Sequence, residues 1–591
     1  MGQGAASATP AAKGGNGIVA EPEDTTARAR PGGTFRSYLT ADVPTFDVLA
    51  SGSSAALTNF GIYTYPRLLK FIPGKHPERA TGGVEGDLAE SFEISTDHLQ
   101  VTFRIRQGLK WDQARPTNGR LIDAQDVVFS WDKFARVSPF KNEIAFDPVL
   151  SPGAPVESVK ATDTRTVVVR LKQPDASLLS LFASERLFQV MPRESDGGFD
   201  PRVEARGYGP WLLTENSPSA FRAWTRNPAY HVKDRPIFDR LEQAIVPEYA
   251  ARLAEFKAGN IWPAVAAQSD VLRVKKELPD TLLQKFDGFS TVLSTLAFGY
   301  APGGPWKDER LRQAVSLLLD REAFVEMGSH VRKLSSEVLP VEVRYHSVVA
   351  AGWEDYWIDP TNVDKFGPNA RYYTHDPAEA RSLLEAAGFP EGLDSLIHYN
   401  GGGQYGPLYT RTAELVSGML GAGGIRAQVD PREYQNDWLP NYYYGYAASA
   451  NAGKPIKGFG GLAFRPGVPY ATAAAQIFST MHKDGTRFLG MTSDGLNPQL
   501  GDPEVQARVD AIRREYDVKK QQALVQDFAR FMARKAYVIP VPPYASLFYT
   551  LSWPVIANLG VYTGWPAGGA ATETALHYWI DPSKPPLAQT S

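Results

Sequence analysis

The stretch from Gly86 to Phe134 constrains the fold of this chain more than any other. Apolar and polar side chains alternate strictly from residue 99 to residue 106, and such alternation predicts a strand with one buried face. The apolar positions are Leu99, Val101, Phe103 and Ile105. Farther on, Asp123 is placed to cap a helix with one apolar face. That face consists of Val127, Val128, Trp131 and Phe134.

The length and composition indicate a globular protein of several domains. A chain of 591 residues is too long for one hydrophobic core, so we expect two or three domains. The net charge of -3 gives no reason to expect a nucleic-acid partner. Because the chain has no cysteine, and its histidines form no pair at ligand spacing, we expect no metal site and no disulfide. There is no apolar run long enough to predict a membrane span.

The first 33 residues are rich in glycine, alanine and proline. They contain no apolar core of a signal peptide, so the sequence as given shows no secretion signal. We interpret residues 1–33 as a flexible N-terminal tether. A cytoplasmic protein with an irregular N-terminus is the alternative interpretation.

Further periodic segments follow along the chain. In the first half we expect a strand at 34–40, a hairpin made of 156–163 and 166–171, and a second hairpin that opens at Gly207–Trp211 and returns over 221–226. These strands suggest a small β-rich subdomain at about 83–204. In the second half a strand is expected at 291–300. Helices are expected after the capping residues Asp308 and Asp376, and over 503–516 and 518–535.

The segment from Leu396 to Asp430 allows a different function. A short strand leads into Gly401–Gly406, which fits G-x-G-x-x-G, and then come a helix over 407–420 and a strand that ends at Asp430. A dinucleotide-binding unit needs glycines near the phosphates and an acid for the ribose. One hypothesis is therefore an NAD-dependent oxidoreductase that uses Gly401, Gly403, Gly406 and Asp430. The other interpretation is a tight turn that faces a ligand cleft.

Aromatic side chains gather near the middle of the second half. Five rings fall within nine positions, namely Trp438, Tyr442, Tyr443, Tyr444 and Tyr446. Such a run offers stacking faces with hydrogen-bonding tips, as a cleft for varied ligands requires. A buried segment whose rings pack in the core would show the same sequence pattern. The chain has no G-x-S-x-G elbow, and nothing in it points to a catalytic residue.

The order of these features resembles the family 5 extracellular solute-binding proteins, which include the dipeptide- and oligopeptide-binding proteins of ABC importers. The matching positions of the first block run from Leu88-Ala89-Glu90-Ser91-Phe92, through Phe103, Arg106, Gly108, Trp111 and Asp112, to Asp126-Val127-Val128-Phe129-Ser130. A second block matches at Asp308, Arg310, Arg312, Gln313, Ala314, Asp320 and Arg321. Similarity extends from about Gly33 to Asp581.

The resemblance implies an α/β, periplasmic-binding-protein-like fold of type II with an extra subdomain. Lobe I would comprise 34–292 and 546–591, with the β-rich subdomain at 83–204, and lobe II would comprise 293–545. Two strands would join the lobes, near Phe298-Gly299-Tyr300 and near Pro542-Pro543-Tyr544, so that the lobes can close on a ligand. The protein would be periplasmic or extracellular, with or without a lipid anchor, and a monomer without a cofactor. Its partners would be an ABC permease and its ATPase.

The resemblance also suggests where a ligand would bind. In peptide-binding members a second-lobe segment of the form WxADYxDPxxF carries an aspartate that pairs with the peptide amine. The corresponding residues here, 444–451, contain no acid, and none appears before Asp484. A neutral oligosaccharide, or a peptide-like solute held through other groups, fits as well as a peptide. The expected ligand contacts are Thr40, Asp42, Tyr208, Gln404, Tyr405, Trp438, Tyr444 and Tyr446.

Overall fold

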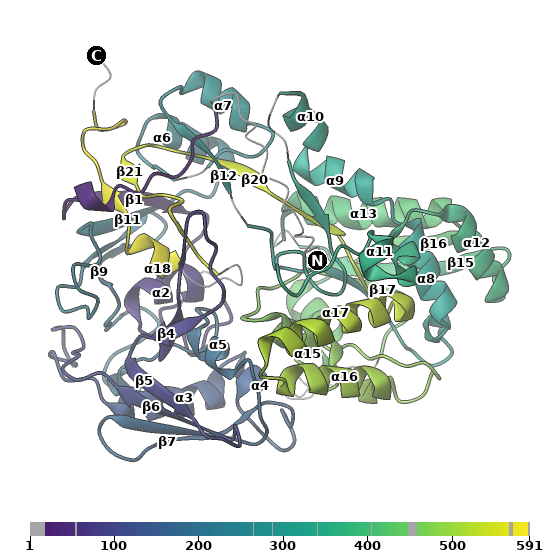
Figure 1. Ribbon diagram of the computed structural model, residues 1–591, viewed down its shortest axis with the longest axis horizontal. Helices are drawn as coiled ribbons and strands as arrows, with labels where there is room; N and C mark the ends of the chain where they lie inside the picture. The colour runs from purple at the N-terminus through teal and green to yellow at the C-terminus, as the bar shows by residue number, and fades with distance from the viewer. Residues whose placement is uncertain are drawn as a thin grey trace, which may run out of the picture.

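The computed structural model describes residues 18–588 except 54–55, 264, 287, 338, 340, 403–404, 447–457 and 566–570. It has two lobes, visible in Figure 1 as a purple-to-blue half beside a teal-to-green half. The yellow C-terminal segment returns to the first half. Separate clusters of buried apolar side chains fill the two halves. The expected α/β fold with two lobes is confirmed.

Lobe I is built on a mixed four-stranded sheet in the order β1-β11-β10-β9. The strands are β1 (Thr34–Leu39), β9 (Trp211–Ser217), β10 (Phe221–Arg226) and β11 (Arg240–Ile245). β1 runs parallel to β11, whereas β10 is antiparallel to both of its neighbours. The expected first strand and the hairpin from Trp211 are confirmed. Helices α6 (Tyr249–Lys257) and α7 (Val271–Glu277) follow the sheet.

A second sheet of lobe I contains the Gly86–Phe134 signature. Its antiparallel strands, in the order β5-β6-β8-β7, are β5 (Ala89–Ile94), β6 (Gln100–Ile105), β8 (Thr166–Leu171) and β7 (Val156–Ala161). Val101, Phe103 and Ile105 of β6 are buried as the alternation predicts. Helix α3 (Ala124–Val137) begins at Asp123, whose carboxylate accepts hydrogen bonds from the Gln125 and Asp126 amides. The strand, turn and helix of the signature are therefore confirmed.

One buried acid of the signature lies at the centre of an ion network. The Asp126 carboxylate has no exposed surface. It accepts hydrogen bonds from Arg120 at 2.8 Å, Arg193 at 3.2 Å and the Trp111 indole at 3.2 Å. A buried carboxylate with several charge-assisted donors fixes its surroundings. This part of the signature therefore holds the subdomain together rather than lining a cleft.

Lobe II is built on a five-stranded sheet in the order β16-β15-β17-β13-β18. The strands are β13 (Thr295–Phe298), β15 (Leu393–Asn400), β16 (Ile425–Arg432), β17 (Leu462–Arg465) and β18 (Val538–Pro540). β15 is parallel to both β16 and β17, and β13 is antiparallel to β17 and β18. The carboxyl ends of β15 and β17 therefore lie at one edge of the sheet, where ligands of open α/β sheets bind.

Helices surround this sheet. They are α8 (Glu309–Leu318), α9 (Arg321–Ser329), α10 (Val331–Ser336), α11 (Val363–Phe366), α12 (Pro377–Ala386), α13 (Gly406–Ala422), α15 (Ala473–Met481), α16 (Pro503–Arg514), α17 (Val518–Lys535) and the π-helical turn η7 (Tyr434–Tyr443). The expected caps hold, because Asp308 accepts from the Arg310 amide and Asp376 from the Glu379 amide.

Two ribbons connect the lobes. β12 (Leu282–Phe286) pairs with β20 (Phe548–Ser552), and β14 (Val343–Tyr345) pairs with β19 (Tyr544–Ser546). The chain passes from lobe II back to lobe I close to the expected Pro542-Pro543-Tyr544. The chain passes from lobe I to lobe II between Phe286 and Thr295, which is nearer the N-terminus than the expected Phe298-Gly299-Tyr300. The sequence interpretation took 291–300 for one strand, but Thr295–Phe298 is a fully buried central strand of lobe II.

Residues 18–33, which composition placed in the flexible tether, make specific contacts with lobe I. Val19 forms a parallel bridge with Leu283. Thr25 donates its amide hydrogen to Asn558 Oδ1 at 2.8 Å, and the Trp579 indole donates to Thr25 Oγ1 at 2.8 Å. These partners come from distant parts of the chain, so local composition could not reveal them. Residues 1–17 lie outside the described residues.

The short elements of lobe I are η1 (Thr26–Arg28), η2 (Leu57–Gly61), α2 (Ile62–Thr64), β2 (Leu69–Phe71), β3 (Gly74–Lys75), β4 (Val84–Gly86), α4 (Lys141–Ile144), α5 (Leu178–Ala183), β21 (Ile556–Ala557), β22 (Tyr562–Thr563), α18 (Ala571–Ala575) and β23 (Trp579–Ile580). In the part of the chain that the structure describes, no helix combines the length and the apolar character that crossing a membrane would need.

Candidate ligand-binding cleft

A large cavity lies between the two lobes. Its volume is about 2340 Å³, and it is lined by both lobes and by the connecting ribbons. Arg79 and Trp565 line it from lobe I, and Trp353 and Tyr356 from lobe II. At the ribbons, Phe286 and Phe548 line it as a stacked pair with ring centroids 4.5 Å apart. Because pockets for small ligands usually measure about 300–1,000 Å³, this space has room for a solute of several units together with water.

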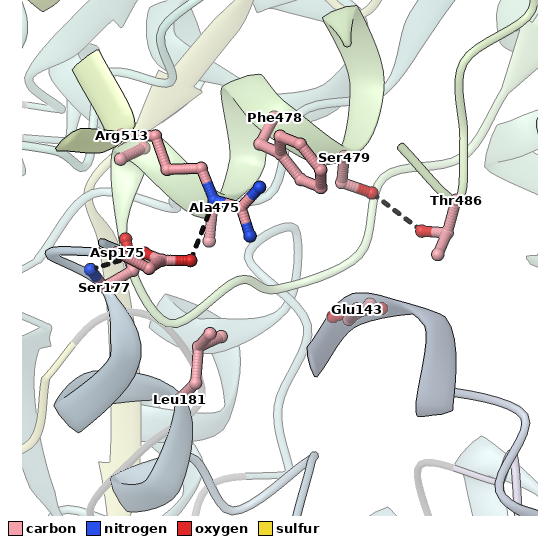
Figure 2. A pocket seen from close by; sticks show the side chains of 10 residues that line it. Glu143, Asp175, Ser177, Leu181, Ala475, Phe478, Ser479, Thr486 and Arg513 are labelled. Carbon is pink, nitrogen blue, oxygen red and sulfur yellow. Dashed lines mark hydrogen bonds and ion pairs between the residues drawn. The ribbon is translucent and has the colours of Figure 1, made fainter. Parts of the chain in front are cut away.

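Beside this cavity the lobes touch along a seam, shown in Figure 2. Asp175 of lobe I and Arg513 of α16 form an ion pair at 2.8 Å across it. The Ser177 and Thr472 hydroxyls are hydrogen-bonded across it at 2.9 Å. A second cavity of about 20 Å³ lies in the seam, lined by Glu143 and Leu181 on one side and by Phe478, Ser479 and Thr486 on the other. That is room for about one water molecule, so the lobes are closed here.

The Asp175–Arg513 pair is deeply buried. The two side chains are 2% and 5% exposed. Arg513 also donates to the Gly153 carbonyl of lobe I, and its guanidinium lies 3.9 Å from the centre of the Phe478 ring. Each charge loses its water in this position and is neutralised by the opposite lobe. Since removing one partner of a buried pair leaves an uncompensated charge, the pair favours the closed arrangement only while both charges are present.

The lobe II side of the seam continues into a group of tyrosines and arginines. Arg465 is the last residue of β17, and Arg487 follows α15. The Arg487 guanidinium lies 4.4 Å from the centre of the Tyr443 ring. Tyr470 is hydrogen-bonded to Ser479 at 2.9 Å and faces Arg186 of lobe I at 5.6 Å. We call Arg465, Arg487 and the rings of Tyr405, Tyr409, Tyr443, Tyr444 and Tyr470 the arginine–tyrosine wall.

Two of the ligand contacts expected in lobe II belong to this wall. Tyr405 is partly buried, and its ring lies 6.0 Å from that of Tyr434 and 5.0 Å from that of Tyr409. Tyr444 packs at 5.3 Å against Tyr443. Burial, then the neighbouring Tyr443 hydroxyl, raises the pKa of both phenols. Both hydroxyls therefore stay protonated at neutral pH and can donate hydrogen bonds.

The other residues expected in lobe II lie elsewhere. Trp438 has no exposed surface and stacks on Tyr442 at 5.7 Å inside an apolar cluster. Tyr446 packs against the same cluster, and its amide donates to the Phe488 carbonyl at 3.0 Å. Trp438 therefore has the position of a core residue, as the alternative interpretation of the aromatic run allowed. Gln404 lies outside the described residues.

The three residues of lobe I that were expected to contact a ligand differ in how exposed they are. Thr40 is exposed just after β1. Asp42 accepts hydrogen bonds from Arg222 at 2.7 Å and from the Ser219 amide at 2.7 Å, so its carboxylate is held within lobe I. Tyr208 is completely buried next to Tyr230 and His231. None of the seven described residues expected to touch a ligand lines either of the two cavities.

The glycine loop lies in a strand–helix–strand unit, as expected. β15 and β16 are parallel, and α13 connects them. A Cβ on Gly401 would lie 2.7 Å from Pro431 Cβ, so packing alone requires a glycine there. The Asp430 carboxylate is bound by His398 at 2.6 Å and by Arg432. Its Oδ2 atom is therefore engaged by two neighbouring side chains of the same strand pair, whereas in a dinucleotide-binding unit this acid binds the ribose.

Sequence reasoning missed the seam and the two wall arginines. Asp175 and Arg513 are 338 residues apart, and no local pattern connects them. Arg465 left a weak signal, because it ends the apolar run Leu462–Phe464 directly before Pro466, and all four residues of β17 are buried. A charged residue at the end of a buried strand is unusual enough to single out.

The two lobes, the paired ribbons and the cavity between the lobes define a periplasmic-binding-protein-like architecture of type II, with the antiparallel β5–β8 sheet as the added subdomain. The comparisons with known proteins agree. The family model described as "Bacterial extracellular solute-binding proteins, family 5 Middle" matches residues 83–455. The chain belongs to this family, as the resemblance indicated.

Curated relatives are named as binding proteins. The chain is 25% identical over 398 residues to "Heme-binding protein A" of Haemophilus influenzae, covering 63% of this chain and 65% of the relative. It is 26% identical over 383 residues to a "Putative ABC transporter peptide-binding protein" of Brucella ovis, covering 62% of this chain and 64% of the relative. The matched part thus spans slightly less than two thirds of the length of these relatives.

A solved structure has the same fold. The ABC transporter-associated periplasmic binding protein DppA from Helicobacter pylori, in complex with the peptide STSA, superposes with a TM-score of 0.68 at 16% identity. The match covers 94% of this chain and 100% of that one.

Proposed function

We propose that this protein is the extracytoplasmic substrate-binding component of an ABC importer. It captures a peptide, oligosaccharide or similar solute between its lobes and delivers it to a membrane permease with its ATPase. The observation that carries the proposal is the closed seam beside a roomy inter-lobe cavity, in a chain of family 5. We place the lobe boundaries at 34–292 plus 546–591 and at 293–545.

The mechanism follows from the connections. In the open form the lobes separate about the β12–β20 and β14–β19 ribbons, and the ligand reaches the cleft. Ligand contacts from both lobes, together with the Asp175–Arg513 pair, then stabilise the closed form. The protein acts as a monomer, and its ligand leaves chemically unchanged. These features describe a binding protein of a transport system rather than an enzyme.

The test is a thermal-shift screen of the full chain against short peptides, oligosaccharides and NAD(H). A ligand at about a hundred times its dissociation constant adds roughly 2.7 kcal/mol of stability. Small-angle scattering of each hit must show a smaller radius of gyration, and chromatography must recover the ligand unaltered. Stabilisation by NAD(H) alone, or consumption of the ligand, would contradict the proposal.

A further inference from the structure

The most exposed aromatic rings of the described residues line the large cavity between the lobes. Phe286 and Phe548 are 50% and 37% exposed, and no other described Phe, Tyr or Trp is as exposed. They lie directly opposite each other at the end of the β12–β20 ribbon, with ring centroids 4.5 Å apart and ring planes 13° from parallel. Exposed apolar surface in a groove commonly marks a ligand site, so the two rings indicate where an apolar group binds.

Neutral polar side chains continue the same face of the ribbon. Side chains two residues apart on a strand share a face. Beyond the two rings, the next cross-strand pair on this face is Gln284 and Thr550, and the pair after that contains Ser552. All three polar side chains line the cavity. We call Phe286, Phe548, Gln284, Thr550 and Ser552 the ribbon face.

The hydroxyl of Ser552 is suited to a hydrogen bond with the ligand. The residue lines the cavity but is only 1% exposed, and its Oγ atom has no hydrogen-bond partner among the described residues. A buried hydroxyl without a partner destabilises the protein that contains it. Two residues before Phe286, Gln284 Nε2 donates to the Leu559 carbonyl at 3.2 Å, and its Oε1 atom can accept from a ligand. The polar half of the ribbon face therefore offers neutral groups for hydrogen bonding.

The surroundings of the two rings are apolar. Gly288, Phe289 and Ala545, which are close to them in the sequence, line the same cavity. Phe289 and Ala545 belong to a small cluster of buried apolar side chains. A sugar hydroxyl placed here would lose its hydrogen bonds to water without replacing them. An apolar side group would bury its own surface and that of the rings, which favours binding.

The charged side chains next to the ribbon face are paired or lie on its other side. Lys285 also lines the cavity, but strand alternation places it on the opposite face of β12 from Phe286. Arg344 pairs with Glu342 at 3.2 Å and with Glu354 at 2.8 Å. The ribbon face itself contains no charged residue, so it suits a neutral part of a ligand rather than a charged end.

We propose that the ribbon face binds a bulky apolar side group of the transported solute together with a neighbouring neutral amide. The ligand is then a peptide with an aromatic or branched side chain rather than an oligosaccharide. The inference rests on the proposed function and narrows its substrate class. From the two rings to Ser552 the ribbon extends over four residue steps, about 14 Å in a strand. An extended peptide of about four residues can lie along this length.

The test compares ligands that differ only in one side chain. Calorimetry measures the affinity of the full chain for tetraalanine and for tetrapeptides in which one alanine, at each position in turn, is replaced by Phe, Leu or Ser. Maltotetraose is the oligosaccharide probe. At the best position we expect the Phe and Leu peptides to bind roughly tenfold to a hundredfold more tightly than tetraalanine. The Ser peptides should gain nothing, and maltotetraose should not bind.

Three variants locate the apolar half of the subsite. In Phe548→Ala the preference for the Phe peptide over tetraalanine should shrink roughly fivefold or more, with little change in the ligand-free melting temperature, because the ring is exposed. Phe548→Leu keeps an apolar side chain and should keep most of the preference. Leu121→Ala is the matched control, because Leu121 is 53% exposed and lines neither cavity. This control should leave every affinity unchanged.

A fourth variant tests the polar half. Ser552→Ala removes the hydroxyl without a partner, so the ligand-free melting temperature should stay the same or rise. The affinities for all the tetrapeptides should fall by a common factor, roughly fivefold to tenfold. The preference for Phe over Ala should therefore survive in this variant. A lower melting temperature with unchanged affinities would mean that the hydroxyl is structural, and the polar half of the proposal would be wrong.

The remaining outcomes separate the subsite from the transport function. Equal affinity for the Phe peptides and tetraalanine, or a full preference in Phe548→Ala, overturns the subsite but leaves the transport function standing. Binding of maltotetraose, or of no tetrapeptide at all, overturns the substrate class in the same way. The transport function fails as well only if no solute of the thermal-shift screen stabilises the chain.

Discussion

Replacing Asp175 by Asn should shift the lobes toward the open form. The substitution keeps the size of the side chain and its hydrogen bond from the Ser177 amide, but it leaves Arg513 charged and 5% exposed in the seam. Breaking a buried ion pair from one side costs about 3–5 kcal/mol. In the open form Arg513 regains water, so this cost falls on the closed form alone. The ligand concentration that half-closes the protein should rise roughly a hundredfold or more.

The distance between two spin labels, one on each lobe, measures this closure directly by double electron–electron resonance. Because the chain has no cysteine, Glu157→Cys in β7 and Ala523→Cys in α17 place one exposed label on each lobe. The ligand found in the thermal-shift screen is added in increasing amounts. At each concentration, the fraction of molecules with the shorter distance between the labels gives the fraction that is closed. Glu504→Gln is the matched control, since it removes an exposed pair with Arg508 on the same helix as Arg513, and surface pairs of this kind contribute about 0–1 kcal/mol.

A rescue variant completes the design. In Asp175→Leu with Arg513→Met, neither charge is buried, and methionine can pack on Phe478 in place of the guanidinium. Replacing a whole buried pair by apolar groups is often neutral, so closure should return. The reasoning is refuted if Asp175→Asn half-closes at the wild-type ligand concentration, or if the double variant opens as far as the single one.

Three further predictions concern stability, each measured by urea unfolding. Asp376→Ala removes the cap that accepts from the Glu379 amide at 2.9 Å and should cost about 0.5–2 kcal/mol; an unchanged midpoint would contradict the cap. Phe103→Ala empties a fully buried position beside Phe182 and should cost about 3–5 kcal/mol; a loss below 1 kcal/mol would mean the site collapses. Burial lowers the pKa of His346 to about 4, so the unfolded chain binds more protons below about pH 6.5, and up to about 3 kcal/mol of stability is lost as pH falls from 6.5 to 4. Burial also lowers the pKa of His231, His482 and His577 to about 4, so His346→Asn should make that part of the curve shallower without flattening it. An unchanged pH dependence would refute this assignment.

Local patterns predicted much of the fold. The structure contains the alternating strand in 99–106, the capping aspartates before α3, α8 and α12, and both lobe I hairpins. Each of these features depends on residues that are close together in the sequence. The resemblance supplied what local patterns could not, namely the assembly of these elements into two lobes. The first connection was misplaced because a fully buried strand carries no alternation to mark its ends.

The cleft was less predictable, for physical reasons. Trp438 and Tyr405 look alike in a sequence, since an aromatic ring suits a core and a cleft equally, and only packing places the first in the core. The pair Asp175–Arg513 depends on two surfaces that meet only when the lobes close. Arg465 and Arg487 come from different segments, and only the folded chain shows that Arg465 donates to the Arg487 carbonyl and Arg487 to the Pro466 carbonyl.

The segment that passes from lobe II back to lobe I, Tyr544–Ser552, has a mechanical consequence for closure. Its first part, β19, is hydrogen-bonded to lobe II, and its second part, β20, is hydrogen-bonded to lobe I, with the buried Leu547 between them. Rotation of the lobes is therefore concentrated in a few backbone torsions rather than spread along a slack linker. Such a pivot limits the directions in which the lobes can rotate. In the proposed transport function, the separation of the outer rims would report occupancy of the cleft, so that a permease could recognise a loaded molecule without touching its ligand.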